Sequence, residues 1–67
     1  MRTEHLQIIK RQKPYAVAKN TETGEYELWL MAGKNKFVDQ DDVFPTRTEA
    51  LDAMPWAVDG YNRFMGR

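Results

Sequence analysis

Apolar and polar residues alternate in two short runs of the first half of the chain, at residues 15–19 and 26–31. The polar stretch between them contains Gly24, which suits a turn that needs a positive φ. A four-residue loop at 21–24 then sets three pairs opposite one another: Lys19 and Tyr26, Val17 and Leu28, and Tyr15 and Leu30. This register puts the larger apolar side chains on one face, and a shift by one residue destroys it. The pattern therefore predicts an antiparallel hairpin.

Two further strands are expected on either side of this hairpin. A strand at about 5–10 and a turn at 11–13 give two pairs: Leu6 with Val17, and Ile8 with Tyr15. After a second turn at 32–36, a short strand at 37–38 gives two more: Phe37 with Ala32, and Val38 with Met31. The first half thus predicts an antiparallel meander of three to four strands. Its apolar face comprises Leu6, Ile8, Tyr15, Val17, Tyr26, Leu28, Leu30 and Phe37.

The second half changes to a helical period. Thr46 and Glu49 form a capping box, in which the threonine hydroxyl can accept a hydrogen bond from the glutamate amide. An apolar stripe follows at helical spacing, and it consists of Ala50, Leu51, Met54, Ala57, Val58, Tyr61 and Met65, with Phe64 at its edge. Pro55 removes one helical amide, so we expect the helix to bend there. The fold predicted is α+β: an antiparallel three- to four-stranded meander with one C-terminal helix, kinked near Pro55, packed on one sheet face.

Composition narrows the class of protein. The 67 residues suffice for a single small domain, residues 1–67, and 10 basic residues balance 10 acidic ones, so the net charge implies no highly charged partner. Cysteine and serine are absent, which excludes catalysis by a cysteine or serine nucleophile. His5 is the one histidine, which excludes metal sites with several histidine ligands. No apolar run is long enough to span a membrane. We expect a soluble, cytoplasmic domain without a membrane partner.

Two local features are candidate sites. Asp39, Asp41 and Asp42 offer carboxylates, but a calcium loop spreads its ligands over about twelve residues with a central glycine and a closing glutamate. An acidic loop before the helix is expected instead, with no metal and no cofactor. A two-layer domain of this size rarely encloses a deep pocket, and a lone histidine is more often a surface residue than a catalyst. We therefore expect no catalytic residues and no enzyme activity.

The junction between the predicted sheet and helix resembles two DNA-binding families. The residues that carry the resemblance, within positions 44–57, are Phe44, Thr46, Glu49, Ala50, Ala53 and Ala57. They are similar to the plant ethylene-response-factor domain and to the amino-terminal arm-binding domain of tyrosine integrases. The resemblance implies a three-stranded sheet packed on one helix, with DNA read by the exposed sheet face. A small nucleic-acid-binding domain of this type is the alternative function.

The exposed sheet face expected from the registers is apolar rather than basic. It carries His5, Gln7, Ile9, Ala16, Ala18, Glu25, Glu27, Trp29, Met31 and Val38. A DNA-reading sheet needs cations for the phosphates and arginine for the bases, and this face holds neither. Exposed apolar patches usually mark protein interfaces, in which tryptophan and methionine are enriched. The predicted partner-binding residues are Ile9, Trp29, Met31, Val38 and Trp56, with an electrostatic rim of Arg11, Lys13, Lys34 and Lys36 in the turns.

The sequence thus predicts a small non-enzymatic protein-binding module that docks on another protein or forms a homodimer. Two alternatives stay open at this point: another segment covers the apolar face, or the registers differ. Short, cysteine-free chains without a catalytic set are common among phage and mobile-element proteins that inhibit host machinery, and we expect this class. Nucleic acid is the second-ranked partner.

Overall fold

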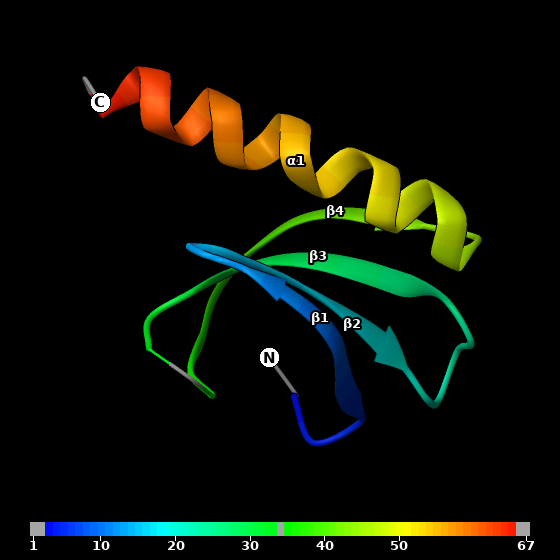
Figure 1. Cartoon of the computed structure of the whole chain (residues 1–67). Helices are drawn as coiled ribbons and strands as arrows, with labels where there is room; N and C mark the ends of the chain where they lie inside the picture. Colours follow the sequence, from blue (N-terminus) through cyan, green and yellow to red (C-terminus); the bar gives the residue numbers. More distant parts are fainter. Residues whose placement is uncertain (1–2, 34, 66–67) are drawn as a thin grey trace.

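The computed structural model describes residues 3–33 and 35–65. Four strands and one helix follow one another along the chain (Figure 1): β1 (Leu6–Gln12), β2 (Tyr15–Asn20), β3 (Tyr26–Met31), β4 (Phe37–Phe44) and α1 (Arg47–Phe64). The strands form one antiparallel sheet in the order β1-β2-β3-β4, and α1 packs across one of its faces. The predicted α+β meander with a C-terminal helix is confirmed.

The central β2–β3 hairpin has the predicted register, with these pairs: Lys19 and Tyr26, Val17 and Leu28, and Tyr15 and Leu30. The side-chain oxygen of Asn20 accepts hydrogen bonds from the amides of Glu22 and Thr23, at 2.9 and 3.2 Å. Gly24 takes a φ of 81°. Since the asparagine side chain and the glycine fix the length of the loop, they also fix the register of the strands that it joins.

The predicted pairs of Leu6 with Val17 and of Ile8 with Tyr15 are wrong, because the turn lies at residues 13–14 and Leu6 pairs with Asn20. Strand β1 also contains a β-bulge. Its pairs with β2 include Ile8 with Ala18 and Lys10 with Val17, which leaves Ile9 as an extra residue. Because of the bulge, Ile9 rather than Ile8 lies on the side of Val17, and it packs against the core under α1. The expected assignment of these two isoleucines to sheet faces is therefore wrong.

Strand β4 has eight residues, whereas the pattern predicts a two-residue strand followed by an acidic loop. Its pairs with β3 include Phe37 with Met31, Asp39 with Leu30 and Asp42 with Leu28. The register predicted for Phe37 and Val38 against the end of β3 is therefore wrong by one residue. The register shifts at Val38 and at Asp41, which are bulge residues. The aspartates are tolerated in this strand because β4 forms an edge of the sheet and its side chains reach solvent.

Helix α1 begins at the predicted cap. The Thr46 hydroxyl accepts a hydrogen bond from the Glu49 amide at 3.3 Å. The helix has 18 residues and contains Pro55 in its interior. The bend expected at Pro55 stays a prediction. The C-terminal turns of α1 rise away from the sheet (Figure 1). Phe64 and Met65, expected in or beside the buried stripe, are therefore 87% and 49% exposed.

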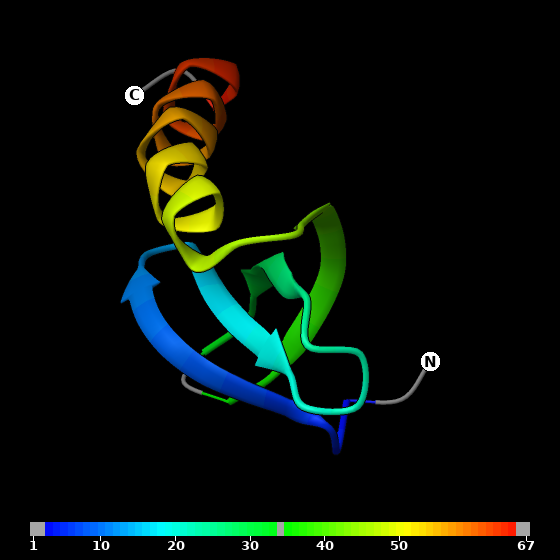
Figure 2. The same ribbon diagram turned by 90° about the vertical axis from the view of Figure 1, so that its right-hand side faces the viewer.

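The main core lies between α1 and the middle of the sheet. Val17 and Leu28 meet Ala50, Met54 and Val58 of the helix. The half-buried residues packed around them are Ile9, Tyr15, Tyr26, Phe44, Leu51 and Ala57. Figure 2 shows that the sheet is strongly twisted, with β4 running at a steep angle to β1. We call the sheet face turned away from α1 the inner face.

Candidate functional site

The inner face is where the sequence predicts an exposed partner-binding patch, and the structure shows it closed. Trp29 is 2% exposed, and Ala16 and Ala18 are fully buried. The Trp29 indole meets the Phe37 ring edge to face, with 5.3 Å between the ring centres. Phe37, predicted on the helix-facing side, therefore covers part of the inner face. The expected exposure of Trp29 is wrong.

A buried carboxylate organises this face. Glu27 is 7% exposed and accepts three hydrogen bonds: from the Trp29 indole at 2.8 Å, the Gln40 side chain at 3.0 Å and the Asn20 side chain at 2.9 Å. The donors come from β2, β3 and β4, so the carboxylate ties three strands together. Burial of a charged group is tolerated only with such partners. Sequence reasoning missed this network because a glutamate in an alternating strand is typical of a solvent-facing position.

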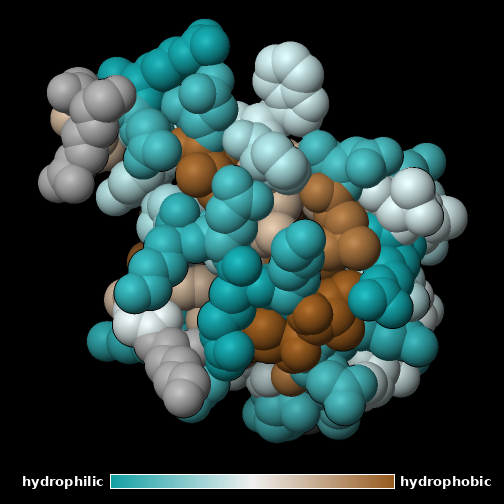
Figure 3. Space-filling view, viewed as in Figure 1, coloured by the Kyte–Doolittle hydropathy of each residue, from teal (hydrophilic) through white to brown (hydrophobic). Residues whose placement is uncertain are grey.

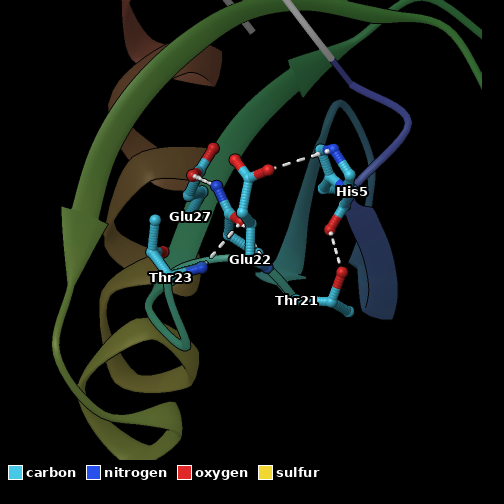
Figure 4. A network of polar contacts seen from close by, with 6 residues as sticks. His5, Thr21, Glu22, Thr23 and Glu27 are labelled. Atoms are coloured by element: carbon cyan, nitrogen blue, oxygen red, sulfur yellow. Dashed lines mark hydrogen bonds and ion pairs between the residues drawn. The ribbon is translucent and has the colours of Figure 1, made fainter.

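Polar contacts at one end of the molecule attach the N-terminal segment to the β2–β3 turn (Figure 4). The amide and the hydroxyl of Thr21 both donate to the His5 carbonyl, at 2.8 and 3.1 Å. The His5 Nε2 atom lies 3.3 Å from the Glu22 carboxylate. The lone histidine is thus part of a surface bridge between two chain segments. Among residues 3–33 and 35–65, no group of three or more acidic, histidine or cysteine side chains is placed to hold a metal ion.

The opposite end of the molecule carries an open groove of about 550 Å³, which we call the turn-end groove. It is lined by Arg11, Lys13, Pro14, Tyr15, Met31 and Gly33. One wall is the two-residue turn Lys13–Pro14, which has a cis peptide bond and replaces the turn predicted at 11–13. The end of β3 forms the other wall, and a 2.8 Å hydrogen bond from the Met31 amide to the Pro14 carbonyl joins the two.

The turn-end groove has cationic residues in its lining. Arg11 and Lys13 line it, and Arg11 donates a 3.2 Å hydrogen bond to the side chain of Asn35 in the β3–β4 turn. Lys36 belongs to the same turn, and Lys34 lies outside the described residues. The structure therefore brings three of the four predicted rim residues to one end of the molecule. It places one predicted partner-binding residue, Met31, among them.

The Tyr15 side chain connects the groove with α1. Its ring contacts the Tyr61 ring edge to face, with 6.2 Å between the ring centres. A hollow of about 260 Å³ beside the two rings is lined by Lys13, Pro14, Tyr61, Asn62 and Met65. Burial raises the pKa of Tyr15 above its usual value of 10.0, and the nearby Asp41 and Tyr61 raise it further. The Tyr15 hydroxyl therefore stays protonated at neutral pH and remains a hydrogen-bond donor.

The other predicted partner-binding residues lie apart from the turn-end groove. Val38 is 45% exposed at a bulge of the edge strand β4. Trp56 is 79% exposed, on the side of α1 opposite its buried residues. Ile9 is half-buried in β1, and Figure 3 shows apolar surface along β1 beneath α1. Phe64, which is 87% exposed, was missed as a surface candidate because it borders the apolar stripe of the helix.

Comparison of the chain with family models, curated proteins and solved structures finds no match. The DNA-binding families that residues 44–57 resemble have a three-stranded sheet with an exposed face, whereas this sheet has four strands and a closed inner face. In the part of the chain that the structure describes, no helix combines the length and the apolar character needed to cross a bilayer.

Proposed function

We propose that this chain is a small protein-binding module that takes an acidic, apolar segment of a partner protein into the turn-end groove. One observation carries the proposal: a groove lined by Pro14, Tyr15 and Met31 also has Arg11 and Lys13 in its lining. An apolar surface supplies binding free energy through burial, and cations at its edge select the charge of what binds.

The shape of the groove favours a chain segment over a small molecule. Sites for small molecules bury about 70–90% of the ligand surface, whereas this groove lies open between two turns. Its volume of about 550 Å³ accommodates one or two apolar side chains of a segment that continues beyond it. Carboxylates beside those side chains would then lie next to Lys13 and Arg11.

The charge distribution of the chain favours an acidic segment. The whole chain is neutral, but its charges are separated along the strands. The end with the groove carries Lys10, Arg11, Lys13 and Lys36 against Asp39 and Asp41, and the opposite end carries Glu4, Glu22 and Glu25 against Lys19. The groove end is therefore positive on balance, and the opposite end is negative. Such a separation steers acidic partners to the groove and disfavours basic ones. A nucleic acid shares the negative charge of the proposed segment but lacks its aliphatic side chains.

Peptides test this proposal directly. One set of short peptides alternates leucine and phenylalanine with aspartate and glutamate, and a matched set has lysine and arginine at the acidic positions. We expect fluorescence anisotropy to detect binding of the acidic set alone. In the presence of these peptides, the nuclear magnetic resonance signals of Tyr15 and Met31 should shift.

The variants Lys13→Glu and Lys10→Glu form a matched pair. Both lysines are exposed and close in sequence, but only Lys13 lines the groove. Lys13→Glu should weaken peptide binding by about tenfold or more, and Lys10→Glu by much less. Equal binding of acidic and basic peptides would overturn the proposal. Binding of a single-stranded oligonucleotide that Lys13→Glu abolishes, without peptide binding, would replace the protein partner by a nucleic acid.

A module that covers a segment of its partner in this way would inhibit that partner. The setting that we propose is inhibition of a host protein in the cytoplasm by a phage or mobile-element chain. Its support is compositional: the chain is short and lacks cysteine and serine.

A further inference from the structure

A second cavity lies beside the turn-end groove, under the C-terminal turns of α1. It is the hollow of about 260 Å³ lined by Lys13, Pro14, Tyr61, Asn62 and Met65, and we call it the helix-end hollow. Figure 1 shows the turn between β1 and β2 beneath the C-terminal turns of α1. Lys13 and Pro14 of this turn line both cavities, so the two share a wall. A chain segment that occupies the groove can therefore continue into the hollow.

The two cavities differ in the chemistry of their linings. The turn-end groove combines apolar side chains with two cations. Three of the five side chains around the helix-end hollow carry hydrogen-bond donors: the ammonium group of Lys13, the hydroxyl of Tyr61 and the amide of Asn62. The hollow is thus suited to a group that accepts hydrogen bonds, whereas the groove is suited to an apolar side chain.

The three donors have no partner within residues 3–33 and 35–65. Lys13 forms no ion pair there, and the side chains of Tyr61 and Asn62 form no hydrogen bond. Among the same residues, no acidic side chain lines either cavity. A ligand group with a negative charge and several acceptor positions can satisfy such a set of donors, and a carboxylate has both properties.

We propose that the helix-end hollow is a subsite for one aspartate or glutamate side chain of the segment whose apolar side chains occupy the turn-end groove. This inference rests on the proposed function and assigns the acidic selectivity of the site to a particular place. Lys13 serves both cavities, and Asn62 and Tyr61 become specificity-determining residues. The last turns of α1 then belong to the binding surface.

The C-terminal end of α1 does not prevent such an occupant. The carbonyl groups at the end of a helix together carry about half of a negative elementary charge. Lys13 contributes a full positive charge to the lining. Arg63 and Asp59 form an ion pair of 2.9 Å and add no net charge. The balance at the hollow is therefore positive, which favours a carboxylate over the neutral amide of glutamine.

A positional series of peptides tests the subsite. Each peptide has a leucine and a phenylalanine as the apolar anchor, acetylated and amidated ends, and one glutamate in an otherwise neutral sequence. The glutamate moves along the segment from one peptide to the next, and a second series has glutamine at the same positions. We expect fluorescence anisotropy to show, at one position or two neighbouring ones, that glutamate binds about fivefold or more tightly than glutamine.

The variants Asn62→Asp and Gly60→Asp form a matched pair. Both add one negative charge at an exposed position of α1, but only residue 62 lines the helix-end hollow. Asn62→Asp should abolish the preference for glutamate at those positions and change the binding of the glutamine peptides by less than about twofold. Gly60→Asp should retain the preference. Unchanged binding of the glutamine peptides also shows that the groove of the variant is intact.

The same measurements separate failure of this inference from failure of the proposed function. A glutamate preference that survives Asn62→Asp, or an equal loss with glutamate and glutamine peptides, would overturn the carboxylate subsite but leave binding in the groove in place. An equal effect of Gly60→Asp would assign the preference to the overall charge of the helix and would also overturn the subsite. If no peptide of either series binds, the proposed function fails and this inference fails with it.

Discussion

The two faces of the sheet are both filled, but by different means. On the helix-facing side, Val17 and Leu28 pack against Met54 and its neighbours in α1. On the inner face, residues 3–33 and 35–65 form no second layer, and Phe37 of the same sheet packs against Trp29. The first face depends on the attachment of a helix, whereas the second depends on contacts within the sheet.

The two faces also differ in polarity. The helix-facing core is aliphatic and aromatic, while the inner face contains the buried carboxylate of Glu27 with its three hydrogen-bond donors. Directional bonds hold Trp29 in one orientation there. Alternation thus assigns residues to a face, but packing between distant residues such as Trp29 and Phe37 decides whether that face is open.

Removal of the inner-face tryptophan should have the largest effect. Trp29→Ala leaves a large cavity, so the free energy of unfolding should fall by about 3–5 kcal/mol. Trp56→Ala, at a position that is 79% exposed, should change it by less than about 0.5 kcal/mol. Urea unfolding followed by circular dichroism measures both. Similar midpoints for the two variants would mean that the inner face contributes little to folding.

Removal of the buried carboxylate of Glu27 should have the next largest effect on the free energy of unfolding. Glu27→Ala leaves donors of Trp29, Gln40 and Asn20 without their acceptor, which should cost about 1–3 kcal/mol. Glu25→Ala, at an exposed position between β2 and β3, is the control and should be close to neutral. If both variants unfold at the same urea concentration, the inner face does not depend on its polar network.

A substitution at the N-terminal cap of α1 tests how strongly the helix-facing side of the sheet depends on the helix. Thr46→Ala removes the acceptor for the Glu49 amide and should cost about 1 kcal/mol. Thr48→Ala lies inside the first turn, has no capping role and should not lower stability. Coincident unfolding curves for Thr46→Ala and the original chain would show that the cap does not limit the attachment of the helix.

The smallest effect concerns Tyr15 at high pH. Its pKa is raised in the folded chain, so its contribution to stability is fully present below the ordinary tyrosine pKa of about 10 and is lost as the pH rises through the folded value. Tyr15→Phe should therefore lose less stability than the original chain between neutral pH and alkaline pH. Thermal unfolding across this range measures the difference. Parallel losses would assign the alkaline transition to other groups.

Local signals made part of this fold predictable. The β2–β3 register followed from alternation and from a turn in which Asn20 and Gly24 fix the loop length. The helix start followed from Thr46 and Glu49. Both depend on residues close together in the sequence, where side-chain chemistry decides the backbone conformation.

Features that depend on distant residues were not predictable. The bulge at Ile9 and those at Val38 and Asp41 shift the register without changing the composition of their strands. The burial of Trp29 involves Phe37, which belongs to another strand. The turn-end groove brings Arg11 and Lys13 together with Met31 and Gly33, which are distant from them in the sequence. Sequence patterning named several residues of this end but not the groove that they form.

The bulges of the two edge strands have a consequence for the behaviour of the chain in concentrated solution. Strand β1 carries Lys10 and Arg11, and β4 carries Asp39, Asp41 and Asp42, so opposite charges would draw the open edges of neighbouring molecules together. Continued pairing of this kind would build fibrils. A bulge in each edge interrupts the regular ladder of amides and carbonyls that such growth needs. The irregular edges therefore protect a short chain from aggregation.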